Sequence, residues 1–425
     1  MGYSFQRYEN YKKVDNLAFD ELPVEWTLKK VKHLFTIGRG RVISQEELDD
    51  NGVFPVYSSQ TQNNGCLGFI NTYDFDCKQI TWTTDGANAG TVFLREGKHN
   101  CTNVCGTLQP ISKNLNFSFY LYSLQYVTQF HKRPDTNGAK IMNGEMAAIS
   151  LCIPSDYEQQ KIANFLDYET AKIDILITKQ EKLIKLLKEK RQAVISHAVT
   201  KGLNPDAPMK DSGVEWLGEV PEHWDLKRFK HLFKIRKRIA GQTGYDILSI
   251  TQKGIKVKDI TSGEGQLSMD YSKYQLVYQG DYAMNHMDLL TGFVDISSHN
   301  GVTSPDYRVF TLEHKLSEPS YYLRLLQMGY LDKLFYPLGQ GAAHIGRWRL
   351  PTEAFNEFIA PCPPSEEQKE ISDYIDKNHR KIDSLLEKAQ GAIILMKERK
   401  AALISAAVTG KIDVRDWQEP TKQQG

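Results

Sequence analysis

The hydrophobic pattern of the chain contains two long segments in which apolar residues recur at alternating steps of four and three. The repeating positions include Ile162, Leu166, Ile173, Leu176, Leu183, Leu187 and Val194 in the first segment and Ile371, Ile375, Ile382, Leu385, Met396 and Leu403 in the second. This spacing is typical of a coiled-coil seam, the row of side chains that faces a partner helix. About 40 residues at a rise of 1.5 Å give helices of roughly 60 Å.

The chain is an internal repeat. The segment Leu22 to Ile37 reappears 198 residues later as Val220 to Ile235, and the helical segment that includes Glu158 reappears 209 residues later from Glu367. The segments between these matches show little similarity. Two related copies whose helices pair antiparallel would be related by a pseudo-two-fold axis, and antiparallel pairing also lets the second variable segment stay compact.

Each long helix has a predicted start. Ser155 is followed three residues later by Glu158, and Ser365 by Gln368, which is the spacing of a capping box. Polar residues interrupt both seams at equivalent places, as expected if they fix the register of the pair.

The variable segments have the pattern of mixed α and β structure. Short β-branched or apolar runs separated by Gly, Asn and Asp predict strands, and one later run in each copy predicts a helix. The predicted strands are 53–57, 79–83, 91–94 and 105–108 in the first copy and 247–250, 275–277, 294–296 and 308–312 in the second; the predicted helices are 117–130 and 320–334. The expected fold class is therefore α+β, with two α/β domains separated by two long helices in an antiparallel coiled coil.

These patterns divide the chain into seven segments. We expect an N-terminal extension at 1–21, a first variable domain at 22–154, a central helix at 155–201, a linker at 202–219, a second variable domain at 220–364, a C-terminal helix at 365–412 and a tail at 413–425.

Composition narrows the class of protein. The chain has 53 Lys and Arg against 52 Asp and Glu, so a nucleic-acid surface has to arise from local clustering. No apolar run is long enough to span a membrane, and we expect a cytoplasmic protein. His99, Cys101 and Cys105 have a spacing that metal sites also use, but alternating half-buried cysteines in a strand explain it better, and no metal site is expected.

Basic residues do cluster, at the edges of both variable domains. Arg, Lys, Asn and Gln are the side chains that read base edges, and glycine-rich loops let the backbone approach phosphate. The clusters therefore predict DNA contact, although each residue alone could be an ordinary surface charge. The predicted DNA-binding residues are Arg39, Arg41, Lys132, Arg133, Asn137 and Lys140 in the first domain and Lys237, Arg238, His344, Arg347 and Arg349 in the second.

Catalytic motifs are weak. The chain has no phosphate-binding glycine loop of the nucleotide-binding types. Asp306 with Glu313 and Lys315 resembles the acidic metal site of nucleases, but the spacing is short and the first copy has no counterpart. No catalytic residue is expected in this chain.

Three strings resemble a known family: Met209 to Trp224, the paired Pro-Ser then Glu-Gln helix starts, and Lys381 to Val414. They closely resemble the specificity subunit of type I restriction-modification enzymes, and the likeness covers nearly the whole chain. It implies two target recognition domains, each reading one half of a split DNA site, and helices that set the gap and dock two methylation subunits. The predicted coiled-coil and docking residues are Ile173, Leu176, Leu183, Leu187, Ile382, Leu385, Met396 and Leu403.

The resemblance also implies a division of labour. The subunit would be needed for both methylation and restriction, while S-adenosylmethionine, ATP and Mg²⁺ would be used by the methylation and restriction-translocase subunits and no cofactor would be bound here. Two alternatives remain: a coiled-coil scaffold that binds proteins at both ends, and a stand-alone nuclease. Salt-dependent binding to duplex DNA would exclude the first, and metal-dependent cleavage lost in Asp306→Ala would support the second.

Overall fold

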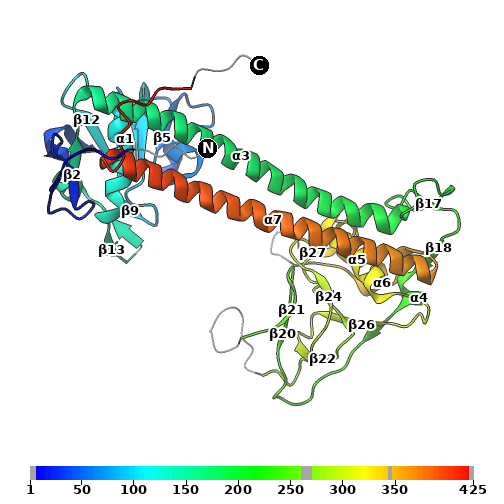
Figure 1. The fold of residues 1–425 in the computed structure, drawn as a ribbon. Coiled ribbons are helices and arrows are strands. Elements are labelled where there is room, and N and C mark those ends of the chain that lie inside the picture. Colours follow the sequence, from blue (N-terminus) through cyan, green and yellow to red (C-terminus); the bar gives the residue numbers. More distant parts are fainter. Residues whose placement is uncertain (1–5, 137, 260–269, 343–346, 421–425) are drawn as a thin grey trace. The chain divides into compact units, whose positions relative to one another are not determined.

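The computed structural model describes residues 6–136, 138–259, 270–342 and 347–420. The chain forms two compact units, one made of Met1–Gln180 with Gly391–Gly425 and the other of Glu181–Gln390. Two long helices, α3 (Asp156–Lys201) and α7 (Ser365–Val408), each contribute to both units (Figure 1). Among the described residues, no helix combines the length and the apolar character needed to cross a membrane.

The first unit is built on a four-stranded antiparallel sheet in the order β10-β8-β12-β4. Its strands are β4 (Phe35–Arg39), β8 (Gln79–Thr83), β10 (Val92–Arg95) and β12 (Cys105–Pro110). Helix α1 (Phe117–Val127) packs with this sheet in a core that contains Trp82, Leu108 and Phe119. The sequence predicted β8, β10, β12 and α1 to within two residues, apart from a short 3-10 turn that continues α1 to Phe130, but it did not predict β4.

Smaller sheets complete the first unit. A second four-stranded sheet has the order β6-β5-β11-β7, and a three-stranded sheet has the order β13-β14-β9. The elements are β5 (Phe54–Tyr57), β6 (Cys66–Ile70), β7 (Phe75–Asp76), β9 (Asp85–Gly86), β11 (Lys98–Cys101), β13 (Arg133–Asp135), β14 (Gly138–Lys140) and α2 (Asn143–Ala148), with two-stranded pairs β1 (Tyr11–Lys13) with β2 (Glu21–Pro23) and β3 (Thr27–Lys30) with β15 (Ser150–Ile153).

The second unit repeats this architecture although its sequence differs. Its main sheet has the order β19-β26-β23-β24, and α5 (Pro319–Leu331) packs with it. The strands are β19 (Phe233–Arg236), β23 (Tyr282–Met284), β24 (Val294–Ile296) and β26 (Arg308–Leu312). The flanking elements are β16 (Met209–Asp211), β17 (Glu219–Pro221), β18 (Asp225–Arg228), α4 (Phe229–Leu232), β20 (Leu248–Thr251), β21 (Gly254–Val257), β22 (Gln275–Val277), β25 (Gly301–Thr303), β27 (Gln340–Ala342), β28 (Arg347–Arg349), α6 (Thr352–Glu357) and β29 (Ile359–Cys362). The repeat seen in the sequence only at the ends therefore extends through the fold of the middle segments.

The capping box predicted at the start of α3 is confirmed. The Glu158 carboxylate accepts a hydrogen bond from the Ser155 backbone N–H at 3.2 Å, and the Glu158 N–H donates to Ser155 Oγ at 3.3 Å. Glu158 also accepts from the indole N–H of buried Trp26 at 3.3 Å. This carboxylate thus fixes the helix start to the core of the first unit.

The capping box predicted at the start of α7 is wrong. Ser365 is the first residue of the helix, and Gln368 instead donates to the Pro363 carbonyl at 2.7 Å and accepts from the Glu318 N–H at 2.8 Å. The prediction failed because one residue is missing between the Pro-Ser and Glu-Gln of this copy, so Gln368 occupies the place of Gln159.

Helices α3 and α7 run antiparallel within each unit. In the first unit Lys400 binds Asp174, and in the second Arg191 binds Asp383. Of the predicted seam residues, Ile173, Leu187 and Ile382 are buried, and Met396 and Leu403 are half-buried.

The predicted seam is wrong at three leucines. Leu176, Leu183 and Leu385 are 49%, 42% and 49% exposed, whereas the neighbouring Ile177 and Ile184 are half-buried. The reason is one additional step of four near residue 173 in α3 and near residue 382 in α7, which places eleven residues in three turns between 166 and 177 and between 375 and 386. That period lies closer to the 3.6 residues per turn of a straight α-helix than a strict heptad does.

Candidate nucleic-acid interface

A basic hairpin in the first unit lies against the loop that follows the central strand β8. Strand β13 pairs with β14 with Arg133 opposite Lys140, and β14 pairs with β9 with Lys140 opposite Asp85. Gly138 has a φ of 123°, and a Cβ there would lie 3.0 Å from the backbone of Gly86. The hairpin can therefore approach β9 closely because this position carries no side chain.

Both charges of this hairpin are compensated within the protein. Arg133 Nε lies 2.5 Å from Glu145 Oε1, and Lys140 Nζ lies 2.9 Å from Asp135 Oδ2. The hydrogen bond from Lys140 lowers the pKa of Asp135. Asn137, the third predicted contact of the hairpin, lies outside the described residues.

The remaining predicted cations of the first unit differ in their surroundings. Arg41 lies between Glu47 and Asp74, at 2.8 Å and 3.2 Å, so its charge is balanced. Among the described residues, Arg39 donates to two uncharged groups, the Asn103 carbonyl and Thr84 Oγ1. Lys132 is exposed, and no ion pair engages it within the described ranges. Arg39 and Lys132 therefore keep a net positive charge beside the hairpin and β9.

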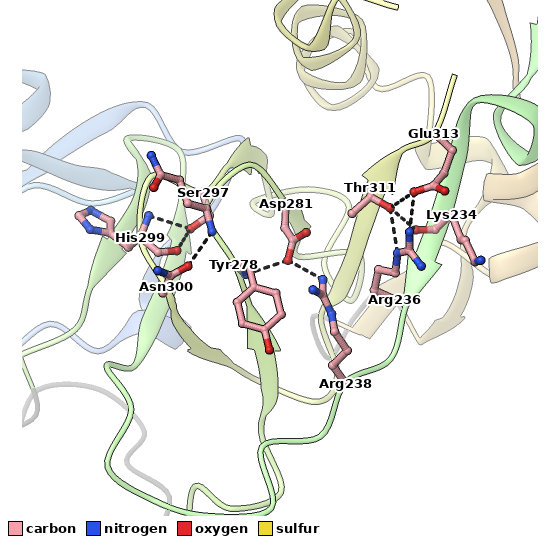
Figure 2. Close-up of polar contacts among 11 residues, drawn as sticks. Lys234, Arg236, Arg238, Tyr278, Asp281, Ser297, His299, Asn300, Thr311 and Glu313 are labelled. Atoms are coloured by element: carbon pink, nitrogen blue, oxygen red, sulfur yellow. Dashed lines mark hydrogen bonds and ion pairs between the residues drawn. The ribbon is translucent and has the colours of Figure 1, made fainter. Parts of the chain in front are cut away.

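In the second unit, Arg236 of β19 and Arg238, which follows β19, each point toward a carboxylate (Figure 2). Arg236 donates to Thr311 Oγ1 at 2.9 Å and to Glu313 at 2.5 Å. Arg238 binds the carboxylate of Asp281 and lies 4.6 Å above the ring of Tyr278. Lys237, between them, is exposed.

The second unit carries a hairpin in the place of β13–β14. Strands β27 and β28 pair antiparallel, with Gln340 opposite Arg349. The Leu289 N–H donates to the Trp348 carbonyl at 3.1 Å, and the Leu350 N–H donates to the His286 carbonyl at 2.9 Å. As in the first unit, the hairpin lies against the loop that follows a central strand, here β23.

Arg349 is exposed on this hairpin, and no ion pair engages it in the part of the chain that the structure describes. His344 lies outside the described residues, and Arg347 is described only as part of the β28 backbone. Burial, followed by repulsion from Arg308 and Arg349, lowers the pKa of His286 to about 3. A neutral imidazole beside these two arginines leaves the local charge positive at neutral pH.

Arg308, which was not among the predicted residues, supports this hairpin through the residue that follows β28. Its side chain is buried, lies 4.7 Å over the Phe355 ring, and donates to the Leu350 carbonyl at 3.0 Å, directly after β28. Arginine is rarely buried, so only the fold could identify this residue as part of the support.

The nuclease alternative does not fit the geometry. Asp306 precedes β26 and Glu313 follows it, so the two carboxylates lie at opposite ends of an extended strand, on the order of 20 Å apart. Glu313 is moreover bound by Arg236. His99 is similarly occupied, with its two ring nitrogens 2.8 Å from the Gln79 amide and the Gly97 carbonyl. Among the described residues, no group of His, Cys, Asp and Glu is arranged to hold a metal ion.

The long helices expose large apolar side chains. Those exposed on α3 and α7 include Ile175, Leu176, Leu183, Leu186, Leu385, Ile394 and Leu395. Exposed apolar side chains in number are typical of protein-binding surfaces. The three leucines that are absent from the seam are thus available to contact another protein.

Comparison with known proteins agrees with this arrangement. A family described as the type I restriction modification DNA specificity domain matches residues 23–185. The chain is 43% identical over 139 residues to a protein of Mycoplasma pneumoniae described as the N-terminus of a type I specificity subunit, and the match covers 32% of this chain and 74% of that protein. A second type I specificity subunit of that organism is 43% identical over 143 residues, and the match covers 32% of this chain and 38% of that relative.

Two further similarities extend over the whole chain. The type I restriction enzyme MjaVIII specificity subunit of Methanocaldococcus jannaschii is 24% identical over 442 residues, which covers 97% of this chain and 98% of that protein. A chain from a solved structure concerned with complex assembly and conformational transition of a type I restriction-modification system is similar with a TM-score of 0.65 at 11% identity, and covers 92% of this chain and 99% of that one. This last likeness concerns the fold alone.

Proposed function

Because the chain belongs to the family of type I restriction-modification DNA specificity subunits, we propose that each of its two variable domains reads one half of a bipartite DNA site. The chain is a DNA-recognition subunit and not itself a catalyst. One observation supports the bipartite assignment. Each unit places a basic hairpin against the loop after a central strand, at the same place in the fold but with different residues.

The basic residues that would contact DNA are those whose charge no carboxylate of the protein balances. Arg39 and Lys132 in the first unit, and Lys237 and Arg349 in the second, carry charges that no carboxylate balances among the described side chains. Arg41, Arg133, Lys140 and Arg238 are held in ion pairs, so they would contact DNA only by exchanging a carboxylate for a phosphate. Asn137, His344 and Arg347 remain assigned to the interface by sequence alone.

The partners follow from the helices. Two methylation subunits would dock on the exposed apolar residues of α3 and α7, and restriction-translocase subunits would join that complex. S-adenosylmethionine, ATP and Mg²⁺ would be used by those partners, in the cytoplasm, with no cofactor held by this chain. The helices would set the unread gap between the two half-sites.

A domain exchange tests the proposal. Residues 220–362 would be replaced by the equivalent segment of a relative, the subunit expressed with its partners, and the methylated motif determined by sequencing genomic DNA. We expect one half of the motif to change and the other to stay. A change in both halves, or in neither, would contradict independent reading.

A second test separates base reading from phosphate contact. If the Arg349 guanidinium reads a guanine edge, Arg349→Ala should reduce the free energy of discrimination between bases at one position of the site by about 1 to 3 kcal/mol. Lys132→Ala should weaken binding to all duplexes alike and reduce the slope of log affinity against log salt by about one. A uniform loss in both variants would assign Arg349 to phosphate contact.

A further inference from the structure

The first unit contains a buried cation, Arg95, at the end of β10. Its residue is 2% exposed, and its guanidinium lies 3.5 Å from the ring centre of Tyr57 and 4.4 Å from that of Phe93. Nε donates to Thr81 Oγ1 at 3.2 Å, and Nη1 donates to the Asn64 carbonyl at 2.7 Å. Burying a guanidinium that no carboxylate balances costs free energy. The position of Arg95 against the segment of Asn64 therefore calls for a functional explanation.

Arg95 holds a loop in an uncommon backbone conformation. Asn63, Asn64 and Gly65 follow one another with φ values of 49°, 54° and 78°. A Cβ at Gly65 would lie 2.8 Å from Arg95 Nη2, so a larger residue at this position would displace the guanidinium. The Ser58 N–H closes the loop by donating to the Gly65 carbonyl at 2.9 Å. The loop is therefore pre-organised, and a bound partner would not have to order it.

The same loop displays hydrogen-bonding side chains that the protein leaves free. Residues 61–64 (Thr-Gln-Asn-Asn) are all exposed, and within the described ranges no hydrogen bond engages the side-chain amides of Gln62, Asn63 or Asn64. Asn88, in the loop that follows β9, lies 3.5 Å from the Ser59 carbonyl through its amide nitrogen. This contact joins the segment that leads into the loop to the segment that follows β9, which pairs with the basic hairpin.

The loop differs from the basic hairpin in whether its polar side chains are already bound within the protein. Arg133 and Lys140 are bound by Glu145 and Asp135, whereas no side chain or backbone group of the described residues competes for the amides of residues 62–64. A side-chain amide pairs bidentately with the N6 and N7 edge of adenine in the major groove. We propose that the loop of residues 61–64 is a base-reading segment of the first domain, that Gln62 and Asn63 recognise adenine, and that Arg95 is the positioning residue that holds the loop. This inference rests on the proposed function and adds the reading residues.

The direct test uses Gln62→Ala and Asn63→Gly in the full subunit with its partners. Glycine removes the Asn63 amide and keeps the positive φ. Binding to duplexes that carry the methylated motif should fall about 10- to 100-fold for either variant, and the motif should become degenerate at one position of the first half-site. The second half-site should not change. Asn114→Gly, in an exposed turn of the same unit, is the matched control and should leave the motif and the affinity unaltered.

The positioning role has its own test, because Arg95→Lys keeps the charge and loses the forked contacts. We expect this variant to reduce the ratio of affinities for cognate and single-base-mismatched duplexes at the same position as Asn63→Gly, with binding to unrelated duplexes preserved. A lowered Tm with an unchanged affinity ratio would overturn the positioning role. If Gln62→Ala and Asn63→Gly keep the motif while the domain exchange still transfers a half-site, the loop proposal is wrong and the proposed function stands. If the wild-type complex shows no sequence preference, the proposed function fails first.

Discussion

Asp174 and Asp383 occupy the same position of the internal repeat, and each carboxylate binds a basic side chain of the other long helix. Both Asp174 oxygens lie 2.7 Å from Lys400 Nζ, and Asp383 Oδ1 lies 3.4 Å from Arg191 Nε. Arg191 and Lys400 are also equivalent, since 209 residues separate each of these pairs along the chain. The two ion pairs are therefore one contact made twice, once in each unit.

The ion pair in the first unit should show a small and specific coupling. Exposed pairs of this kind contribute roughly 0.2 to 1 kcal/mol. A double-mutant cycle with Asp174→Ala and Lys400→Ala, measured as free energy of unfolding in denaturant, should give a coupling in that range. The cycle that pairs Asp174→Ala with Arg399→Ala, the exposed neighbour, should give none. Equal coupling in both cycles would contradict the register.

The observed seam predicts different costs for two adjacent leucines of α3. Leu187 is 8% exposed and Leu186 is 51% exposed. Leu187→Ala should lower the free energy of unfolding by about 2 to 4 kcal/mol, because it removes a buried side chain and leaves a cavity. Leu186→Ala should change it by less than about 0.5 kcal/mol. The opposite order of costs would show that the helix is rotated relative to the structure.

Stability of the second unit should depend on pH through His379. Burial, then repulsion from Arg191 and Arg324, lowers the pKa of His379 to about 4, below the value of about 6.5 in the unfolded chain. As pH falls below 6.5 the unfolded chain takes up a proton first, so stability is full above that pH and is lost progressively between pH 6.5 and 4.

Denaturant unfolding across this pH range measures the effect. In His379→Gln, the unfolded chain should bind up to one proton fewer relative to the folded chain. The slope of the free energy of unfolding against pH should therefore change by at most about 1.4 kcal/mol per pH unit. The substitution of exposed His197 by Gln is the matched control. An identical slope in the His379 variant and the wild type would contradict the prediction.

Helix length should set the gap in the DNA target. Four residues inserted after Gln180 and again after Gln390, the points at which the two units divide, lengthen each helix by roughly 6 Å. At about 3.4 Å per base pair, the gap should grow by one to two base pairs while both half-sites stay the same.

The methylated motif, recovered by sequencing, is the measurement for these insertions. Some activity should be lost, because four residues turn the helix by about 400° and not by 360°. An insertion in only one helix should abolish assembly, since it shifts one half of the seam against the other. An unchanged gap with full activity would show that the helices do not set the spacing.

Local sequence signals were sufficient for some of the elements, but they missed β4, β19 and β23 and were insufficient for the seam. The runs at β8, β22, β24 and β26 were predicted with their observed bounds because each combines β-branched residues with flanking turn residues. The seam register failed near residue 173 because Ile175, Leu176 and Ile177 are all apolar. A heptad template then selects Leu176, whereas the helix, with a period nearer 3.6, turns Ile177 inward.

The sequence identified which basic residues could form the interface, but not which of them are held in ion pairs within the protein. Arg39 and Arg41 look alike in the sequence, but Arg41 binds Asp74, 33 residues away, whereas the described partners of Arg39 are uncharged. Partners this distant are fixed by strand order, which the sequence does not reveal. The buried Arg95 and the loop that it holds were missed for the same reason.

The equivalence of Asp174 with Asp383 and of Arg191 with Lys400 has a consequence for subunit composition. A fragment that ends at Lys201 already contains both an acidic and a basic member of the cross-helix contact, Asp174 and Arg191. Two identical copies of such a fragment would satisfy both ion pairs reciprocally, as a homodimer. That homodimer would carry one reading specificity twice, and its target would be a palindrome interrupted by the gap. The covalent duplication is therefore what permits an asymmetric target.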